Sequence, residues 1–278
     1  MILYDYIFSR DGGIASVFLD KRKHDVMYYK WRDGAKKKLR KEKCEEFDLS
    51  GLKGYYYSAG RKPSGKIAFI VHGYRSNHLE TAGVWREFYK KRGIDIFCPD
   101  NPAAGNSCGD YVGYGYFESK ACLDWIDFLK EKFGNDIKII IHGFSLGGAA
   151  ALDMSDTVPG NVKFIIDDCG FTGGNDLLKI KLGRFYEFIR KINLKKAGYD
   201  LKDTDVRPHL RGAKVPILFV HGVKDSTVPF RMGLENYVNC RTDKDCLFVD
   251  DAIHMESYYL EKDRYEEKIG KFIEKYLS

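Results

Sequence analysis

Apolar strand-like runs alternate with amphipathic segments along most of this chain, and this alternation limits the fold more strongly than any other feature of the sequence. The apolar runs, rich in β-branched and aromatic residues, lie at 67–71, 94–98, 137–142, 163–167, 216–221 and 246–249. The predicted helices lie at 79–92, 117–133, from Ser145 to near Pro159, near 231–240 and at 257–277. Strands that are apolar on both faces are typical of a mostly parallel sheet covered by helices on each side. The sequence therefore predicts one α/β domain over residues 1–278.

About 48 residues separate the fourth and fifth apolar runs, which is too long for one crossover helix. Apolar residues recur there at helical spacing, at Leu177, Leu178, Leu182, Phe185, Phe188, Ile189 and Ile192. We expect a small helical cap insertion at about 174–212, lying over the ends of the strands. An ordinary helix followed by a long loop is the alternative.

Residues 1–45 form an N-terminal extension whose structure the pattern gives only in outline. Aromatic residues at Tyr28, Tyr29 and Trp31 favour a helix packed against the main body. Residues 47–57 then hold two strand-like runs separated by Ser-Gly, which predicts a β-hairpin.

The charge distribution bears on possible partners. The net charge of +6 is modest, but basic residues gather at 30–43 and 179–196. Such clusters can contact nucleic acid or an anionic membrane. Because no nucleic-acid-binding motif accompanies them, we interpret them as solvated helix faces and predict no nucleic acid partner. Contact with a membrane surface is the weaker alternative.

Targeting and redox signals favour a cytoplasmic protein. No apolar run approaches the roughly 20 residues that span a bilayer, and no signal peptide is evident. The seven cysteines form neither a C-x-x-C pair nor a Cys/His metal spacing. This pattern indicates reduced thiols, and it predicts no metal site.

Residues 139–150 hold the strongest candidate for chemistry. An apolar run leads into Gly143-Phe144-Ser145-Leu146-Gly147 and then into small residues that can start a helix. A strand, a sharp turn and a helix would expose the Ser145 hydroxyl at the apex of the turn. The glycines permit the turn where side chains would clash. The G-x-S-x-G pattern alone is weak, and a turn that merely connects two elements is the alternative.

Further polar residues follow other apolar runs at their carboxyl ends, where the sites of parallel α/β proteins gather. His72-Gly73-Tyr74 follows the first run and Ser145 follows the third. Asp225 follows the fifth run, and His254 follows the sixth. These positions supply a turn for an oxyanion, a nucleophile, an acid and a base, in the chain order Ser, Asp, His.

Four motifs on these strands resemble those of the α/β-hydrolase superfamily. They are H-G-Y-x-S-N at 72–77, G-F-S-x-G-G at 143–148, D-C-x-F-T at 168–172 and H-G-x-x-D-x-x-V-P at 221–229. The resemblance extends from about residue 46 to the end and is greatest to bacterial serine hydrolases. Characterised relatives are esterases, lipases, thioesterases and peptidases, so the resemblance implies the chemistry better than the substrate.

The resemblance implies a role for each matching residue. Ser145 is the nucleophile, His254 the general base and Asp225 the acid that orients the histidine. The backbone N–H groups of Tyr74 and Leu146 would form the oxyanion hole. No cofactor or metal is implied.

Other acidic and histidine residues compete for these roles. Asp167 and Asp168 end the strand after Ser145, where some members of this fold carry the acid, but Asp225 lies in the matching motif. Three histidines at strand ends are predicted to be structural, namely His72, His142 and His221.

One loop departs from the pattern of the relatives. They commonly carry R-x-H-G-x-S after the second strand of the alternation, whereas this chain has Pro-Ala-Ala-Gly-Asn-Ser at 102–107. The Arg and His are absent, so the polar contacts of that loop do not transfer. The glycine- and tyrosine-rich residues 109–116 either shape the pocket or form an ordinary surface loop.

The sequence thus predicts a metal-free serine hydrolase that cleaves a small-molecule acyl ester, in the manner of a carboxylesterase. A peptidase or thioesterase with the same residues is the alternative within this class. A non-catalytic binding protein of the same fold, acting at an anionic surface, is the alternative outside it. Substrate identity and oligomeric state cannot be read from the sequence.

Overall fold

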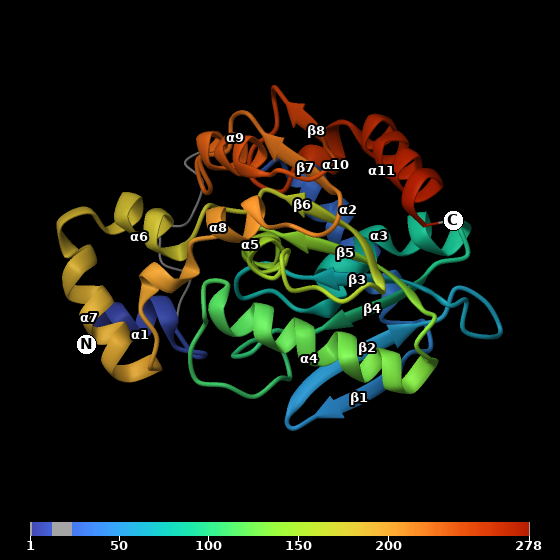
Figure 1. Cartoon of the computed structure of the whole chain (residues 1–278), viewed down its shortest axis with the longest axis horizontal. Helices are drawn as coiled ribbons and strands as arrows, with labels where there is room; N and C mark the ends of the chain where they lie inside the picture. Colours follow the sequence, from blue (N-terminus) through green and yellow to red (C-terminus); the bar gives the residue numbers. More distant parts are fainter. Residues whose placement is uncertain (1, 13–23, 278) are drawn as a thin grey trace.

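The described part of the computed structural model, residues 2–12 and 24–277, contains one sheet of eight strands (Figure 1). The strands are β1 (Glu45–Leu49), β2 (Leu52–Tyr57), β3 (Lys66–Val71), β4 (Asp95–Pro99), β5 (Lys138–Phe144), β6 (Val162–Asp168), β7 (Ile217–Gly222) and β8 (Lys244–Val249). Their spatial order is β1-β2-β4-β3-β5-β6-β7-β8. The β1–β2 hairpin adds antiparallel to β4, and the pairs from β4 to β8 are parallel. The predicted mostly parallel sheet is confirmed.

Helices cover both faces of this sheet, because successive residues of each buried strand point to opposite sides. On one side lie α3 (His78–Lys91) and α11 (Lys262–Tyr276); on the other lie α4 (Tyr116–Phe133), α5 (Leu146–Asp153) and α9 (Phe230–Asn239). Ile140 of β5 packs in the cluster that contains Trp85 of α3. The next residue, Ile141, packs in the cluster that contains Trp125 of α4. Adjacent residues of one strand therefore serve two cores.

Two helix predictions differ from the structure. The helix after Ser145 ends at Asp153 rather than near Pro159, because the chain tightens into turns from Ser155 onward. The proline also disfavours a helical conformation for the residue that precedes it, Val158. The predicted helix at 257–277 is interrupted at Glu261, which leaves its helical conformation. The interruption divides the segment into α10 (Ser257–Leu260) and α11.

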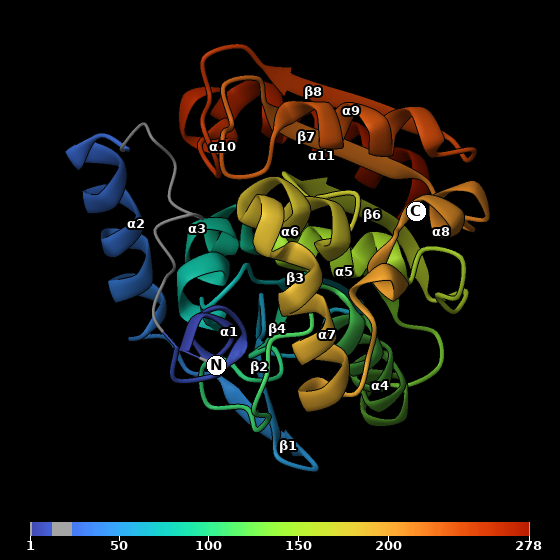
Figure 2. The same cartoon turned by 90° about the vertical axis from the view of Figure 1, so that its left-hand side faces the viewer.

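The described part of the N-terminal extension forms two helices, α1 (Ile2–Phe8) and α2 (Val26–Leu39) (Figure 2). Helix α2 lies against α3, with Tyr28 buried and Trp31 partly buried. The helix packs against the main body as predicted, and Tyr29 on its other side is 51% exposed. Helix α1 lies against the segment that joins β6 to β7, where Tyr4 Oη donates to Asn193 Oδ1 over 3.2 Å.

The segment that joins β6 to β7 is helical, as predicted. It contains α6 (Gly174–Leu182), α7 (Tyr186–Ala197) and the short α8 (Arg207–Arg211), with single turns of 3₁₀-helix after α6 and α7. Leu177 and Ile189 of this segment pack in one apolar cluster with Leu146 of α5 and with Tyr114 of the loop before α4. The segment therefore lies at the carboxyl ends of the strands (Figures 1 and 2). That it acts as a separate cap stays a prediction.

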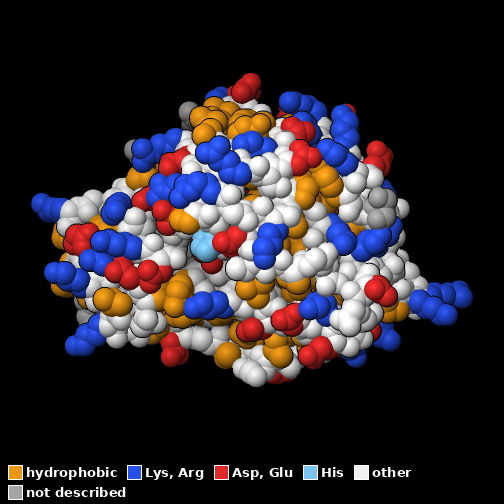
Figure 3. Space-filling model, in the orientation of Figure 1, with side chains coloured by type: hydrophobic (Ala, Val, Ile, Leu, Met, Phe, Trp, Pro, Cys, Tyr) orange, Lys and Arg blue, Asp and Glu red, His pale blue; other side chains and the backbone are white. Residues whose placement is uncertain are grey.

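The surface carries charges of both signs. Figure 3 shows Lys and Arg side chains interspersed with Asp and Glu on one face. Within the predicted basic clusters, Lys36 pairs with Glu80 at 2.9 Å and Lys196 with Asp5 at 2.6 Å. All seven cysteines lie in the described part of the chain as free thiols. Among the helices described, none has the length and apolar character that crossing a bilayer requires.

Candidate active site

Ser145 occupies the apex of a sharp turn between β5 and α5. Its backbone has φ 54° and ψ −112°, a conformation that non-glycine residues rarely adopt and that costs on the order of 1–3 kcal/mol. A side chain on Gly143 would place its Cβ 2.3 Å from the carbonyl oxygen of Gly147. The glycines are therefore required by the close approach of helix and strand. The Ser145 amide donates to the Asp168 carbonyl over 2.8 Å, which anchors the turn to β6.

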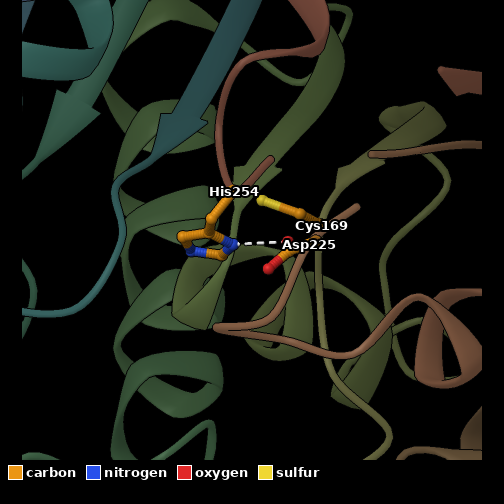
Figure 4. A group of neighbouring side chains, drawn as sticks. All are labelled: Cys169, Asp225 and His254. Atoms are coloured by element: carbon orange, nitrogen blue, oxygen red, sulfur yellow. Dashed lines mark hydrogen bonds and ion pairs between the residues drawn. The ribbon is translucent and has the colours of Figure 1, made fainter. Parts of the chain in front are cut away.

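The structure brings Ser145, His254 and Asp225 together from three separate loops. His254 Nε2 lies 3.0 Å from Ser145 Oγ, and His254 Nδ1 lies 2.7 Å from Asp225 Oδ2. Figure 4 shows the second of these contacts, with His254 and Asp225 facing one another. The other carboxylate oxygen, Asp225 Oδ1, accepts from the amides of Thr227 and Val228, each over 2.9 Å. These bonds fix the carboxylate, so that it can orient the imidazole.

The loop after β3 lies directly beside the serine. A Cβ on Gly73 would stand 3.5 Å from Ser145 Cβ, which places the loop within van der Waals distance of the nucleophile candidate. Leu146 is the first residue of α5, so the helix itself offers its N–H no acceptor. Tyr74 lies two residues after His72, so the Tyr74 amide belongs to the same loop. Both predicted oxyanion donors thus lie on elements that meet at Ser145.

His72 braces this loop, as the sequence predicted. Its Nδ1–H donates to the Gly73 carbonyl over 2.7 Å, and its Nε2 accepts from the Asn101 amide over 2.9 Å. Burial lowers the pKa of His72, so the ring stays neutral and keeps both bonds.

The other strand-end histidines are also buried in structural contacts. His142 lies between the hydroxyls of Tyr89 and Tyr265, at 3.0 and 3.1 Å. His221 Nε2 donates to the carbonyl of Val228 over 3.0 Å. Burial lowers the pKa of both histidines, which matches neutral core residues rather than a base that must take up a proton.

The competing carboxylates have other surroundings. Asp167 Oδ1 accepts from the Gly170 amide over 3.0 Å, and Asp168 Oδ2 accepts from Tyr265 Oη over 3.0 Å. Within the described residues, Asp168 Oδ1 has no hydrogen-bond partner. Burial raises the pKa of Asp168 to about 7 and that of Asp167 to about 8, whereas an acid partner must stay ionised to stabilise an imidazolium. Asp225 is the carboxylate that contacts the histidine directly, over 2.7 Å, and is therefore the better candidate.

The loop that lacks the Arg and His of the relatives is held by different contacts. Gly105, at φ 52°, packs so closely on Asp100 that a Cβ would meet its Oδ2 at 2.2 Å. Asp100 Oδ2 in turn accepts from the Asn106 amide over 2.8 Å. Arg10 Nη2 of the N-terminal extension donates to the Gly105 carbonyl over 2.8 Å. The residues that follow contribute Tyr114 to the buried apolar cluster that contains Leu146, and that they shape the pocket stays a prediction.

The N-terminal extension holds both loops of the site, which the sequence did not predict. On one side, Tyr74 Oη donates to the Ile7 carbonyl over 2.6 Å. On the other, Tyr28 Oη donates to the carbonyl of Met255, next to His254, over 3.1 Å. Periodicity gives no signal for such contacts, because they are single side chains reaching backbone oxygens. Tyr28 belongs to a tyrosine-rich stretch before residue 30, but Tyr74 lies outside it, so this feature of the sequence does not point to both contacts.

Comparisons with known proteins agree with this architecture. No family model matches the chain. An uncharacterised protein of Bacillus subtilis, YqkD, is 24% identical over 235 residues, which is 80% of this chain and 75% of that protein. The structure of the esterase Pf2001 of Pyrococcus furiosus superposes with a TM-score of 0.70 at 20% identity, over 87% of this chain and 95% of that one. The acylaminoacyl peptidase of Pyrococcus horikoshii superposes with a TM-score of 0.66 at 18% identity, over 86% of this chain and 42% of that one.

These likenesses establish the class of fold. The chain has the α/β-hydrolase fold, and the predicted resemblance to that superfamily is confirmed at this level. Because the superposed structures share so little sequence with this chain, they do not carry over a substrate.

Proposed function

We propose that this protein is a serine hydrolase that cleaves acyl esters through an acyl-enzyme intermediate. The observation that supports it most directly is the unbroken line of contacts from Ser145 Oγ through the imidazole of His254 to the carboxylate of Asp225. A serine hydroxyl is a weak nucleophile unless a base removes its proton, and this arrangement provides the base and its orienting group.

In the proposed reaction, His254 Nε2 accepts the proton of Ser145 as Oγ attacks the acyl carbonyl. Asp225 keeps the proton on Nδ1 and stabilises the imidazolium that forms. The amides of Tyr74 and Leu146 donate to the oxyanion of the tetrahedral intermediate. Loss of one such donor costs roughly 10²–10³-fold in rate.

Collapse of the intermediate expels the alcohol, which takes its proton from His254, and leaves Ser145 acylated. Water then attacks the acyl group, with His254 again acting as the base and then as the acid. The sequence of steps returns Ser145 to its free hydroxyl and releases a carboxylic acid.

Apolar residues favour an acyl group of modest size. The buried apolar cluster that contains Leu146 also holds Ala103, Val112, Tyr114 and Phe171, together with residues of α6 and α7. An apolar acyl or aryl group that lies against this cluster would lose contact with water. Esterases and peptidases are both among the solved structures of this fold that superpose on the chain, so a peptide or thioester substrate is the alternative.

The test is covalent labelling with a fluorophosphonate, which reports an activated serine irrespective of substrate. We expect the native protein to be labelled and Ser145→Ala to remain unlabelled, with the same circular dichroism spectrum. A folded native protein that fails to label would refute the hydrolase and favour the non-catalytic binding protein. A panel of acyl esters of graded chain length, aryl esters, thioesters and blocked peptides then separates the substrate classes.

A further inference from the structure

We propose that Cys169, His254 and Asp225 form an inhibitory site for a thiophilic divalent cation such as Zn²⁺. The sequence predicts no metal site, because its cysteines form neither a C-x-x-C pair nor a Cys/His metal spacing. The fold brings Cys169, Asp225 and His254 together at the ends of β6, β7 and β8. The inhibitory effect rests on the proposed function, whereas the binding of the cation does not.

The three side chains form a compact set of ligand atoms (Figure 4). Cys169 Sγ, Asp225 Oδ2 and His254 Nδ1 offer sulfur, oxygen and nitrogen, and the ligand atoms of the three residues all lie within 4.8 Å of one another. Around a tetrahedral zinc, neighbouring ligand atoms stand about 3.3–3.6 Å apart. The cluster must therefore contract by about 1 Å, while the 2.7 Å contact between His254 and Asp225 must open by about 0.6 Å.

The backbone directs the thiol toward the acid and the base. Cys169 has φ 53°, in the left-handed region that favours glycine, and its amide donates to the Val220 carbonyl over 2.8 Å. Its Sγ lies 3.5 Å from Met255 Sδ. A thioether is a soft ligand, so Met255 or a water molecule can complete four-fold coordination.

Charge balance favours a divalent cation over a monovalent one. Binding removes the proton of the Cys169 thiol, which passes to solvent, and forms a sulfur–metal bond. One thiolate and one carboxylate then balance the two positive charges of the cation. The combination of thiolate, imidazole and carboxylate suits zinc better than magnesium or calcium, which prefer oxygen ligands.

The bound cation would block catalysis through the tautomer of His254. In the active arrangement Nδ1 carries the proton and Nε2 is the free base that faces Ser145. A cation on Nδ1 leaves the remaining ring proton on Nε2, so the imidazole can no longer accept the proton of the serine. The cation also displaces the carboxylate of Asp225 from its hydrogen bond with the histidine.

His254 is the most exposed of the three proposed ligands. The His254 side chain keeps 15% of its surface exposed, whereas Cys169 is 1% exposed. The imidazole is therefore the first ligand that a cation from solvent meets, and the thiol lies behind it.

The first experiment measures fluorophosphonate labelling at buffered concentrations of free Zn²⁺, with the rate of each variant divided by its own zinc-free rate. The native protein should lose labelling reversibly, with recovery on addition of a chelator. Cys169→Ala and Cys169→Ser should each need at least about 10–100-fold more zinc for half-inhibition. Cys108→Ser removes an exposed thiol and is the matched control, which should behave as the native protein does.

The second experiment measures binding without activity, by calorimetry of Zn²⁺ with Ser145→Ala. One zinc per chain should bind, and the double variant Ser145→Ala/Cys169→Ala should bind at least 10–100-fold more weakly. Equal zinc sensitivity in the native protein and in both Cys169 variants would overturn the proposal, as would its loss in Cys108→Ser. If the native protein does not label even without zinc, the proposed function fails, while calorimetry still decides whether the cation site exists.

Discussion

Gly147→Ala tests whether the contact between α5 and β3 sets the geometry of the proposed oxyanion hole. The added Cβ would stand 2.1 Å from the carbonyl oxygen of Val71 and 2.8 Å from that of His72. These are backbone atoms at the end of β3 and in the residue that follows it. Val71 is paired with Gly143 of β5, so the strand resists displacement. The helix must therefore move away from the strand.

The size of the movement follows from the contact distance. Non-bonded carbon and oxygen atoms normally stay about 3.3 Å or more apart, so the helix start must move by about 1.2 Å. Leu146 moves with it, while Tyr74 stays with β3, so the two proposed donors separate. A misplacement of about 1 Å costs on the order of 10²-fold in rate. Helix propensity works in the opposite direction, since alanine in place of glycine stabilises a helix by about 0.5–1 kcal/mol.

The assay is the second-order rate of fluorophosphonate labelling, with thermal unfolding measured on the same samples. We expect Gly147→Ala to be folded and to label about 10²-fold more slowly than the native protein. Gly270→Ala in α11 makes the same chemical change where the new Cβ meets nothing within 4 Å. It should label at the native rate. A labelling rate for Gly147→Ala within two-fold of native would refute the argument, because the strand and helix would then tolerate the methyl group without disturbing the site.

Two further predictions concern the extension and the core. Tyr28→Phe removes the hydroxyl that donates to the Met255 carbonyl, a bond worth about 1 kcal/mol, so labelling should slow by up to about 5-fold. His142→Gln should change how the free energy of unfolding depends on pH. Burial lowers the pKa of His142 from 6.5, so the unfolded chain binds a proton there that the folded chain does not. Its contribution to stability is therefore present above pH 6.5 and lost below it, by up to about 1.4 kcal/mol per pH unit, and the variant should lose less stability between pH 6.5 and 5.

Each of these predictions has its own check. Tyr29→Phe changes a half-exposed neighbour on α2 and should leave labelling at the native rate; an equal loss in both tyrosine variants would show that the Met255 bond is not the cause. For His142, denaturant unfolding at several pH values gives the two curves. If the native and His142→Gln curves run parallel below pH 6.5, the histidine is not the source of the acid instability.

The sheet could be predicted because its strands are apolar on both faces. A run that is apolar on both faces, such as 137–142, excludes water when helices cover both of its faces. The alternation of such runs with amphipathic helices therefore specifies the fold class. The same logic placed Ser145, Asp225 and His254 at one edge, since parallel strands end together. The structure confirms that the three side chains meet, and their catalytic role stays a prediction.

The contacts that single side chains make between distant parts of the chain could not be predicted. Tyr74 and Tyr28 act through single hydroxyl groups on backbone carbonyls, and a hydroxyl leaves no periodic trace in the sequence. Cys169 was predicted only as part of the D-C-x-F-T motif at 168–172. Its proximity to His254 depends on a left-handed backbone angle that sequence patterns do not reveal. The hydrophobic periodicity of a segment indicates which of its faces is buried, but it does not indicate which atom a side chain contacts.

The hydrogen bonds between the N-terminal extension and the loops after β3 and β8 also affect when the site can be completed during synthesis. Tyr28 and its acceptor Met255 are 227 positions apart, and at about 5–20 residues per second the ribosome needs roughly 10–45 s to make the chain between them. Throughout that time α2 has no histidine loop to hold. A nascent chain can therefore build most of its parallel sheet while its serine is still without a base, and Tyr28 meets its acceptor only after Met255 has been made.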